Sequence, residues 1–266
     1  MPVGMARTDS ILSRRDWRRS ALVSRALNGS NGWAVAGTPQ PTIARATARM
    51  GFEGIGGILS PATDMFKLER MVGRIPIVLI HGLGDTARLF RRMAAHLEQT
   101  GHKVHCLDLV PNNGDTGLDD LALQIKDYVA EQFGPEEKFA LVGFSMGGIV
   151  SRFYVQRLGG IERVLRFVTI SAPHRGTWTA WLRANPGIRQ MRPGSSFLRD
   201  LNDDCSVLER TGFVSIWTRF DLMIVPAQSS ILPTGRSIHV GAIAHPLMVN
   251  DRRVLRLVAK LLSEAP

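Results

Sequence analysis

The sequence predicts an α/β protein in which a mostly parallel β-sheet is covered by helices on both faces. From residue 75 onward, short apolar runs alternate with segments whose apolar residues recur at helical spacing. Each apolar run has the length and continuity of a strand buried on both faces, which is typical of parallel sheets. The chain has 266 residues, which suits one such domain with some residues outside it.

The expected elements alternate along the chain. Strands are expected at residues 75–80, 103–109, 139–142, 164–171, 214–219 and 238–243. Helices are expected at residues 85–100, 118–133, 146–158 and 251–262. Asp85 is placed to cap the first of these helices, and Gly134 and Pro135 end the second. Because strands alternate with helices, each helix is expected to return the chain to a parallel strand.

One long stretch, residues 174–212, contains no expected strand. A connection of this length inside a compact domain indicates either a lid-like insertion or irregular packing. It is rich in large apolar residues, namely Trp178, Trp181, Leu182, Ile188, Met191, Phe197 and Leu198. Two interpretations stay open: these side chains form a rim that binds acyl chains or a lipid surface, or they cover the edge of the sheet.

Residues 1–70 form a separate, basic extension rich in Gly, Arg, Ala and Ser. Among the first fifty residues, eight arginines against Asp9 and Asp16 account for +6 of the formal net charge of +10. Such a segment is typical of a solvated, disordered leader, and its composition also resembles an organelle transit peptide. A basic tail can contact anionic lipid, but no aromatic-interleaved basic patch indicates nucleic-acid binding. The folded domain is therefore expected within residues 71–266.

Other sequence features limit the class of protein. No apolar window is long enough for a transmembrane helix, and no apolar core with a cleavage site indicates a secretory signal. Cys106 and Cys205 make neither a disulfide framework nor a metal-binding spacing. The stretch 54–57 lacks the Lys–Ser/Thr of a phosphate-binding loop. We expect no cofactor and no metal, and a location in the cytoplasm or at a membrane surface, with organelle targeting as an alternative.

The strongest motif is the pentapeptide Gly143–Phe144–Ser145–Met146–Gly147, which has the pattern G-x-S-x-G. It lies between an expected strand and an expected helix, which is the context that this motif requires. The sharp turn lifts the Ser145 hydroxyl above the edge of the sheet, and the glycines allow the neighbouring backbone to approach. A chance glycine-rich turn is the alternative, and the flanking strand and helix disfavour it.

Three segments carry a resemblance to a known family. "IVLIHGLGD" at residues 77–85, "LVGFSMGGIVSRFY" at 141–154 and "SAPHRGT" at 171–177 resemble the bacterial, triacylglycerol lipase-like branch of the α/β-hydrolase superfamily. The resemblance extends from about residue 75 to the C-terminus and does not cover the first seventy residues. It implies the α/β-hydrolase fold and serine hydrolysis through an acyl-enzyme, and it says little about the substrate.

An oxyanion hole and a base must accompany a serine nucleophile. In this fold the hole uses the amide that follows the nucleophile, here Met146, and an amide from a loop after an earlier strand. The loop at residues 81–84 follows the first strand, and Leu83 is its expected donor. An ordinary strand-to-helix turn is the alternative interpretation of that loop.

The expected base is His245, because the order in this fold is Ser, acid, His. His174 comes too early, before any position for the acid, and His239 lies inside an expected strand. The stretch around His245, "GAIAHPLMVND", resembles the family's His loop, although Ala244 replaces the usual glycine and Pro246 follows the histidine. His245 would take the Ser145 proton and return it to the leaving group.

The expected acid is Asp221, which follows "VSIWTRF" and resembles the D-x-x-V-P segment of the family. It would hold the His245 ring in the required tautomer. The competing carboxylates are Asp200, Asp203 and Asp204, which the nearby arginines explain as a surface cluster, and Asp108, which precedes the serine.

The leading hypothesis is a carboxylic ester hydrolase, a lipase-like esterase of lipid metabolism that acts on lipid or other acyl esters. A thioesterase, amidase or acyltransferase could use the same three residues, because fold does not choose among them. A non-catalytic protein of the same fold and a surface binder acting through the basic extension are further alternatives. The expected partners are a small ester or lipid substrate and a lipid surface, without nucleic acid. The sequence predicts no oligomeric state.

Overall fold

A computed structural model describes residues 74–242 and 244–264 of the chain. The basic extension predicted at residues 1–70 lies outside the described residues, and its role stays a prediction. None of the helices in the described ranges is long and apolar enough to cross a membrane.

A six-stranded sheet forms the centre of the fold, and each pair of neighbouring strands is parallel. The strand order is β2-β1-β3-β4-β5-β6. The chain therefore moves to one side from β1 to β2 and then crosses back to β3 on the other side. In open parallel sheets, ligands bind beside the carboxyl ends of the strands where the order reverses. The strands are β1 (Arg74–Ile80), β2 (His102–Leu107), β3 (Phe139–Phe144), β4 (Val164–Ile170), β5 (Val214–Trp217) and β6 (Arg236–His239).

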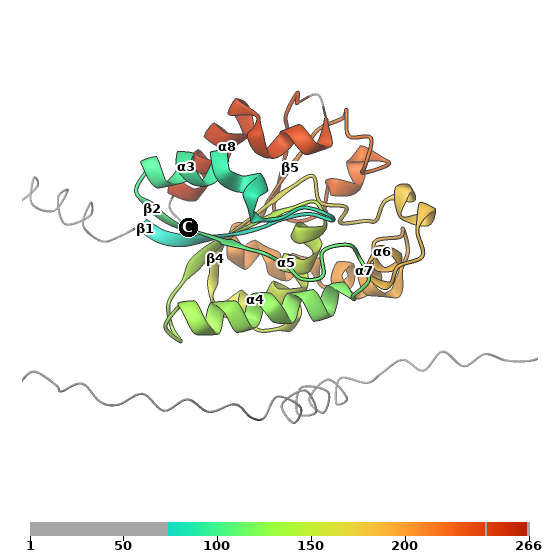
Figure 1. The fold of residues 1–266 in the computed structure, drawn as a ribbon, viewed down its shortest axis with the longest axis horizontal. Coiled ribbons are helices and arrows are strands. Elements are labelled where there is room, and N and C mark those ends of the chain that lie inside the picture. The colour runs from blue at the N-terminus through green and yellow to red at the C-terminus, as the bar shows by residue number, and fades with distance from the viewer. Residues whose placement is uncertain (1–73, 243, 265–266) are drawn as a thin grey trace, which may run out of the picture. The chain divides into compact units, whose positions relative to one another are not determined.

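Two helices cover each face of this sheet. The pair α3 and α8 lies on one face, and the pair α4 and α5 lies on the other (Figure 1). The bounds are α3 (Arg91–Gln99), α4 (Leu118–Gln132), α5 (Met146–Arg157) and α8 (Arg252–Ser263). The predicted arrangement of a parallel sheet between two helical layers is thus confirmed.

The central strand shows why its sequence is continuously apolar. All six residues of β3 are buried. Phe139 and Leu141 face the apolar layer that includes α4 and α5, whereas Ala140 and Val142 face the layer that includes α3 and α8. Because successive side chains of a strand point to opposite faces, a strand covered on both sides needs apolar residues at every position.

Several sequence-based boundaries were wrong. Asp85 does not cap a helix: its amide closes a tight turn onto the Gly82 carbonyl, and a 3-10 turn, η2 (Ala87–Phe90), precedes α3. Asp108 instead accepts the Ala87 amide. The sixth strand spans Arg236–His239 rather than residues 238–243, because an edge strand that is mostly exposed accepts polar residues at its start. The second and fifth strands end at Leu107 and Trp217, two residues earlier than predicted.

The insertion at residues 174–212 contains helical turns and no strand. It comprises η4 (Trp178–Leu182), α6 (Pro186–Gln190), α7 (Ser196–Asp203) and η5 (Cys205–Thr211). Arg152 of α5, which is fully buried, holds α7 by donating to the Leu201 carbonyl at 2.7 Å and to Asn202 Oδ1 at 3.0 Å. Burial lowers the pKa of Arg152 to about 10. The lid interpretation of the insertion stays a prediction.

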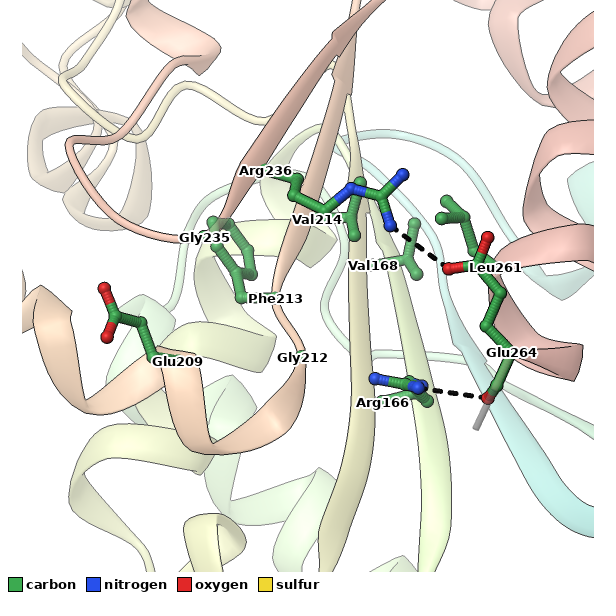
Figure 2. A pocket seen from close by; sticks show the side chains of 10 residues that line it. All are labelled: Arg166, Val168, Glu209, Gly212, Phe213, Val214, Gly235, Arg236, Leu261 and Glu264. Carbon is green, nitrogen blue, oxygen red and sulfur yellow. Dashed lines mark hydrogen bonds and ion pairs between the residues drawn. The ribbon is translucent and has the colours of Figure 1, made fainter. Parts of the chain in front are cut away.

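A pocket opens at the amino ends of β5 and β6 (Figure 2). Arg236 Nη1 donates to Glu264 Oε2 at 3.1 Å, and Arg166 Nη2 donates to the Glu264 carbonyl at 3.0 Å. The residues that line it include no serine, cysteine or histidine. The nucleophile expected from the sequence, Ser145, lies instead at the opposite, carboxyl edge of the sheet, after β3.

We expect Arg152→Ala to lower the free energy of unfolding by at least about 2 kcal/mol. The change removes charge-assisted hydrogen bonds and leaves space in a packed interior. Urea denaturation measures the difference, provided that the m-value is unchanged. The control is Arg210→Ala, which breaks an exposed pair with Glu162 and should change stability by less than about 0.5 kcal/mol. Equal effects of the two substitutions would contradict the anchoring role of Arg152.

Candidate functional site

Ser145 sits at a strained turn between β3 and α5. Its backbone has φ 54° and ψ −124°, a region that side-chain-bearing residues seldom adopt and that is often retained at functional sites. Hydrogen bonds hold it there: the Ser145 amide donates to the Ile170 carbonyl at 2.9 Å, and the Gly148 amide donates to the Ser145 carbonyl at 3.0 Å. The strain is therefore imposed by the neighbouring strand and by the start of the helix.

The glycines around Ser145 allow three backbone segments to meet. A Cβ on Gly143 would lie 2.6 Å from the Gly148 Cα. A Cβ on Gly147 would collide with the carbonyl groups of Ile80 and His81 at the end of β1. Side chains at either position would push β1 and α5 away from β3. The G-x-S-x-G spacing thus reflects a packing requirement as well as a turn.

The structure brings Ser145, His245 and Asp221 together, although they come from three different loops. His245 Nε2 lies 2.9 Å from Ser145 Oγ, and His245 Nδ1 lies 2.7 Å from Asp221 Oδ2. His245 and Asp221 are buried, at 4% and 6% exposure. With its proton on Nδ1, the His245 ring donates to the carboxylate and offers Nε2 as acceptor to the Ser145 hydroxyl.

Asp221 is held by its own loop. Its Oδ1 accepts the amides of Met223 at 3.0 Å and Ile224 at 2.8 Å. Its other oxygen therefore stays directed at His245. These hydrogen bonds from backbone amides orient the carboxylate in the absence of substrate, which is what an orienting acid requires.

The two departures noted around His245 are compatible with its position. Ala244 is extended, with φ −155°, a conformation that needs no glycine. Pro246 lies in the first turn of η7 (His245–Asn250), where a proline is tolerated because the missing amide has no helical acceptor. The Phe144 ring lies beside the imidazole, with centroids 4.8 Å apart.

The competing residues lie elsewhere. His174 is fully buried and lies 2.9 Å from Thr169 Oγ1; burial and the nearby Arg152 hold its pKa well below the usual range. His239 ends β6 and contacts the Trp217 ring. Asp200 and Asp204 both pair with Arg157 at 2.8 Å. Partial burial favours a higher pKa for Asp204, but the hydrogen bonds and charge of Arg157, together with the hydrogen bond of Gln156, lower that pKa overall.

The two expected oxyanion donors, Met146 and Leu83, lie in segments that adjoin Ser145. Met146 begins α5, so its amide has no acceptor within the helix. In the part of the chain that the structure describes, the Leu83 amide has no acceptor either. The turn that carries Leu83 packs against Ser145, because a Cβ on Gly82 would lie 3.0 Å from the Ser145 Cβ.

Sequence reasoning missed the residues that support this turn. His81 is buried; its Nε2 accepts the Leu109 amide at 2.9 Å, and its Nδ1 lies 2.9 Å from the Gly82 carbonyl. Asn112 accepts the Gly84 amide through its carbonyl and donates to the Asp85 carbonyl. The "HG" dipeptide after a strand was a signal for His81, whereas no local pattern pointed to Asn112.

Comparisons with known proteins agree with this architecture. A protein family described as the alpha/beta hydrolase fold matches residues 75–196. The lipase BlEst2 of Bacillus licheniformis, in its mature form, superimposes with a TM-score of 0.61 at 21% identity, covering 73% of this chain and 94% of that one. Lipase B of Aspergillus fumigatus superimposes with a TM-score of 0.62 at 20% identity, covering 72% of this chain and 53% of that one.

A curated relative matches over a shorter length. Norfluorocurarine synthase 1 of Strychnos nux-vomica is 35% identical over 77 residues, which is 27% of this chain and 29% of that protein. The chain thus matches less than a third of that relative. The resemblance to the α/β-hydrolases and their lipases and esterases is confirmed at the level of the fold.

We expect Gly147→Ala to lower the free energy of unfolding by at least about 2 kcal/mol, because the new methyl group would press on backbone carbonyls that cannot yield. Gly134→Ala is the matched control, since a Cβ there meets nothing within 4 Å, and it should change stability by less than about 0.5 kcal/mol. Thermal and urea melts of both variants measure the contrast. A neutral Gly147→Ala would show that β1 and α5 are not packed as described.

We expect Asp85→Asn to stabilise the protein at neutral pH and to lose that effect as the pH falls toward 4. Burial raises the pKa of Asp85, against the opposing influence of His81 and His245. A carboxyl whose folded pKa is raised destabilises the fold once it ionises, so removing its charge helps only above its ordinary pKa. Melting temperatures of the variant and the parent, compared at pH 4 and pH 7, test the sign. A pH-independent difference would refute it.

Proposed function

We propose that this protein of the α/β-hydrolase fold is a serine hydrolase that cleaves carboxylic esters, with Ser145 as nucleophile, His245 as base and Asp221 as orienting acid. The observation that supports the proposal is the continuous hydrogen-bonded series from Ser145 Oγ through the His245 ring to Asp221. Nucleophilic catalysis by serine needs an adjacent base that a third group orients, and these three residues meet that requirement.

In the proposed reaction, His245 Nε2 removes the Ser145 proton while Oγ attacks the ester carbonyl carbon. The carbonyl oxygen gains negative charge, and the amides of Leu83 and Met146 donate to it. His245 then gives its proton to the departing alkoxide, which leaves an acyl group on Ser145. Water attacks this acyl-enzyme, with His245 again as the base, and releases the acid. Asp221 stabilises the positively charged ring in both steps.

The proposed substrates are esters with an apolar acyl group, such as lipid esters. Exposed apolar side chains follow two of the three residues in the sequence: Leu222 and Met223 come directly after Asp221, and Leu247 lies two positions after His245. An apolar approach to the serine favours acyl chains over sugars or charged substrates.

We expect Ser145→Ala to lower kcat/KM for p-nitrophenyl esters by roughly a thousandfold or more, because the acyl-enzyme cannot form. Ser151→Ala is the matched control: this serine lies on α5, and its buried hydroxyl has no hydrogen-bond partner in the described part of the chain. It should keep the parent's activity. The series should extend from acetyl to long acyl esters, and we expect activity to rise with acyl length.

Two outcomes would count against the proposal. Full activity in Ser145→Ala would exclude this nucleophile. No turnover of any ester by the parent protein would exclude simple ester hydrolysis, and thioester, amide and acyl-transfer substrates would be assayed next.

A further inference from the structure

The Asp85 side chain folds back over the turn that follows β1. The Asp85 amide donates to the Gly82 carbonyl at 3.3 Å, and the Gly84 amide donates to the Asn112 carbonyl at 2.7 Å. Gly84 has a φ of 72°, a conformation that closes the turn and that favours glycine. Asn112 Nδ2 also donates to the Asp85 carbonyl. The backbone of Asp85 is thus held from two sides, which limits the directions that its carboxyl group can take.

The carboxyl group of Asp85 lies beside the proposed nucleophile. A Cβ on Gly82 would lie 3.1 Å from Asp85 Oδ2 and 3.0 Å from the Ser145 Cβ. The carboxylate oxygen and the Ser145 Cβ are therefore no further apart than the sum of these two distances. The same point lies 3.3 Å from the Phe144 ring, which itself lies beside the His245 ring. Because Gly82 has no side chain, the Asp85 carboxylate stays within reach of an ester bound at Ser145.

This carboxylate has no partner in the described part of the chain. The hydrogen bonds of Asp85 use its backbone, and no ion pair within residues 74–242 and 244–264 includes it. Partial burial raises the pKa of Asp85, although the charges of His81 and His245 oppose the rise. A carboxylate that is withdrawn from water without a partner is unfavourable for folding. It therefore remains available to a ligand.

A structural role does not account for this carboxylate. Asp108 accepts the Ala87 amide, and Asp251 accepts the Arg253 amide at 2.8 Å. Such bonds are the usual way in which an aspartate stabilises a turn or the start of a helix. The carboxyl oxygens of Asp85 accept no amide from the described residues, although Asp85 itself lies in a tight turn. A group that lowers stability beside a reactive serine is typical of functional sites.

The proposed reaction directs the alcohol part of the ester toward His245. This residue protonates the alcohol oxygen, whereas the carbonyl oxygen faces the amides of Leu83 and Met146. An ionised carboxylate next to the carbonyl oxygen would oppose the negative charge that develops there. His245 lies near enough to Asp85 for its charge to affect the pKa of that carboxyl. The alcohol part is therefore the group that the carboxylate can meet.

We propose that Asp85 is a specificity-determining residue that favours esters whose alcohol part carries a positive charge, such as a quaternary ammonium group. The cation would pair with the carboxylate, and an alcohol part with a negative charge would be repelled. The formal net charge of the chain is +10, which disfavours cations at long range, so this preference has to arise locally. The inference rests on the proposed ester hydrolysis at Ser145 and adds to it the class of alcohol.

Two butyrate esters of similar shape test this preference with the full-length chain. Butyrylcholine carries the ammonium group, and tert-butylethyl butyrate has a carbon atom in place of that nitrogen. We expect kcat/KM of the parent protein to favour butyrylcholine by at least about fivefold at low salt, because a charge pair near a protein surface is attractive but partly screened. Asp85→Asn should make the two esters nearly equivalent, and raised salt should weaken the preference of the parent.

Asp127→Asn is the matched control, because it removes an exposed carboxylate from α4, which covers a face of the sheet. This variant should keep the preference of the parent. A preference that survives in Asp85→Asn, or a parent that hydrolyses both esters equally well, would overturn the role of Asp85. Either result would leave ester hydrolysis at Ser145 intact.

A binding measurement separates this inference from the proposed reaction. Ser145→Ala cannot form the acyl-enzyme, so calorimetry can measure the affinity of this variant for each ester without turnover. We expect tighter binding of butyrylcholine, and we expect the difference to disappear when Asp85→Asn is added. If the parent hydrolyses no ester, the binding difference alone decides: its presence supports a cation site at Asp85 without the proposed reaction, and its absence overturns that site as well.

Discussion

The close contact between the end of β1, the end of β3 and the start of α5 is the constraint on which the rest of the site depends. Three glycines, at 143, 147 and 148, remove the side chains that would separate these segments. Because these side chains are missing, the Ser145 backbone can keep its positive φ, and its amide donates to the Ile170 carbonyl. It also brings the turn at Gly82 against the serine. Packing of backbone against backbone thus sets both the exposure of the hydroxyl and the position of the Leu83 amide.

The parallel sheet gathers everything else at the same edge. Every strand of the described sheet runs in one direction, so the loops that carry Leu83, Ser145, Asp221 and His245 all emerge at its carboxyl side. The pocket at the amino ends of β5 and β6 holds salt-bridged arginine and glutamate instead (Figure 2). Connections at the carboxyl side are free to vary because the core is formed by the strands and by the helices on both faces. The insertion after β4 uses that freedom to place tryptophan and leucine beside the loop of Asp221.

Buried polar residues stabilise these loops without taking part in the proposed chemistry. Arg152 joins α5 to α7, and His81 joins β1 to the chain after β2. Each occupies a position with no access to solvent, where unpaired polar atoms would be costly. Their hydrogen bonds fix the segments that flank Ser145, so the rigidity of the site comes from residues outside the proposed triad.

The sequence by itself determined the layered α/β fold, the parallel strands and the turn at Ser145. The spacing of apolar residues and of glycines is a local property of the chain, so it can be read without the tertiary structure. The sequence also predicted Asp221 as the acid, from its place after an expected strand, and in the tertiary structure its carboxylate lies beside His245, whereas Asp200 and Asp204 pair with Arg157. The tertiary structure alone decided that Asp85 closes a turn instead of capping a helix. The roles of Asn112 and Arg152 likewise arise from contacts between residues distant in sequence. Such contacts form only when the sheet aligns its loops, which periodicity along one segment does not encode.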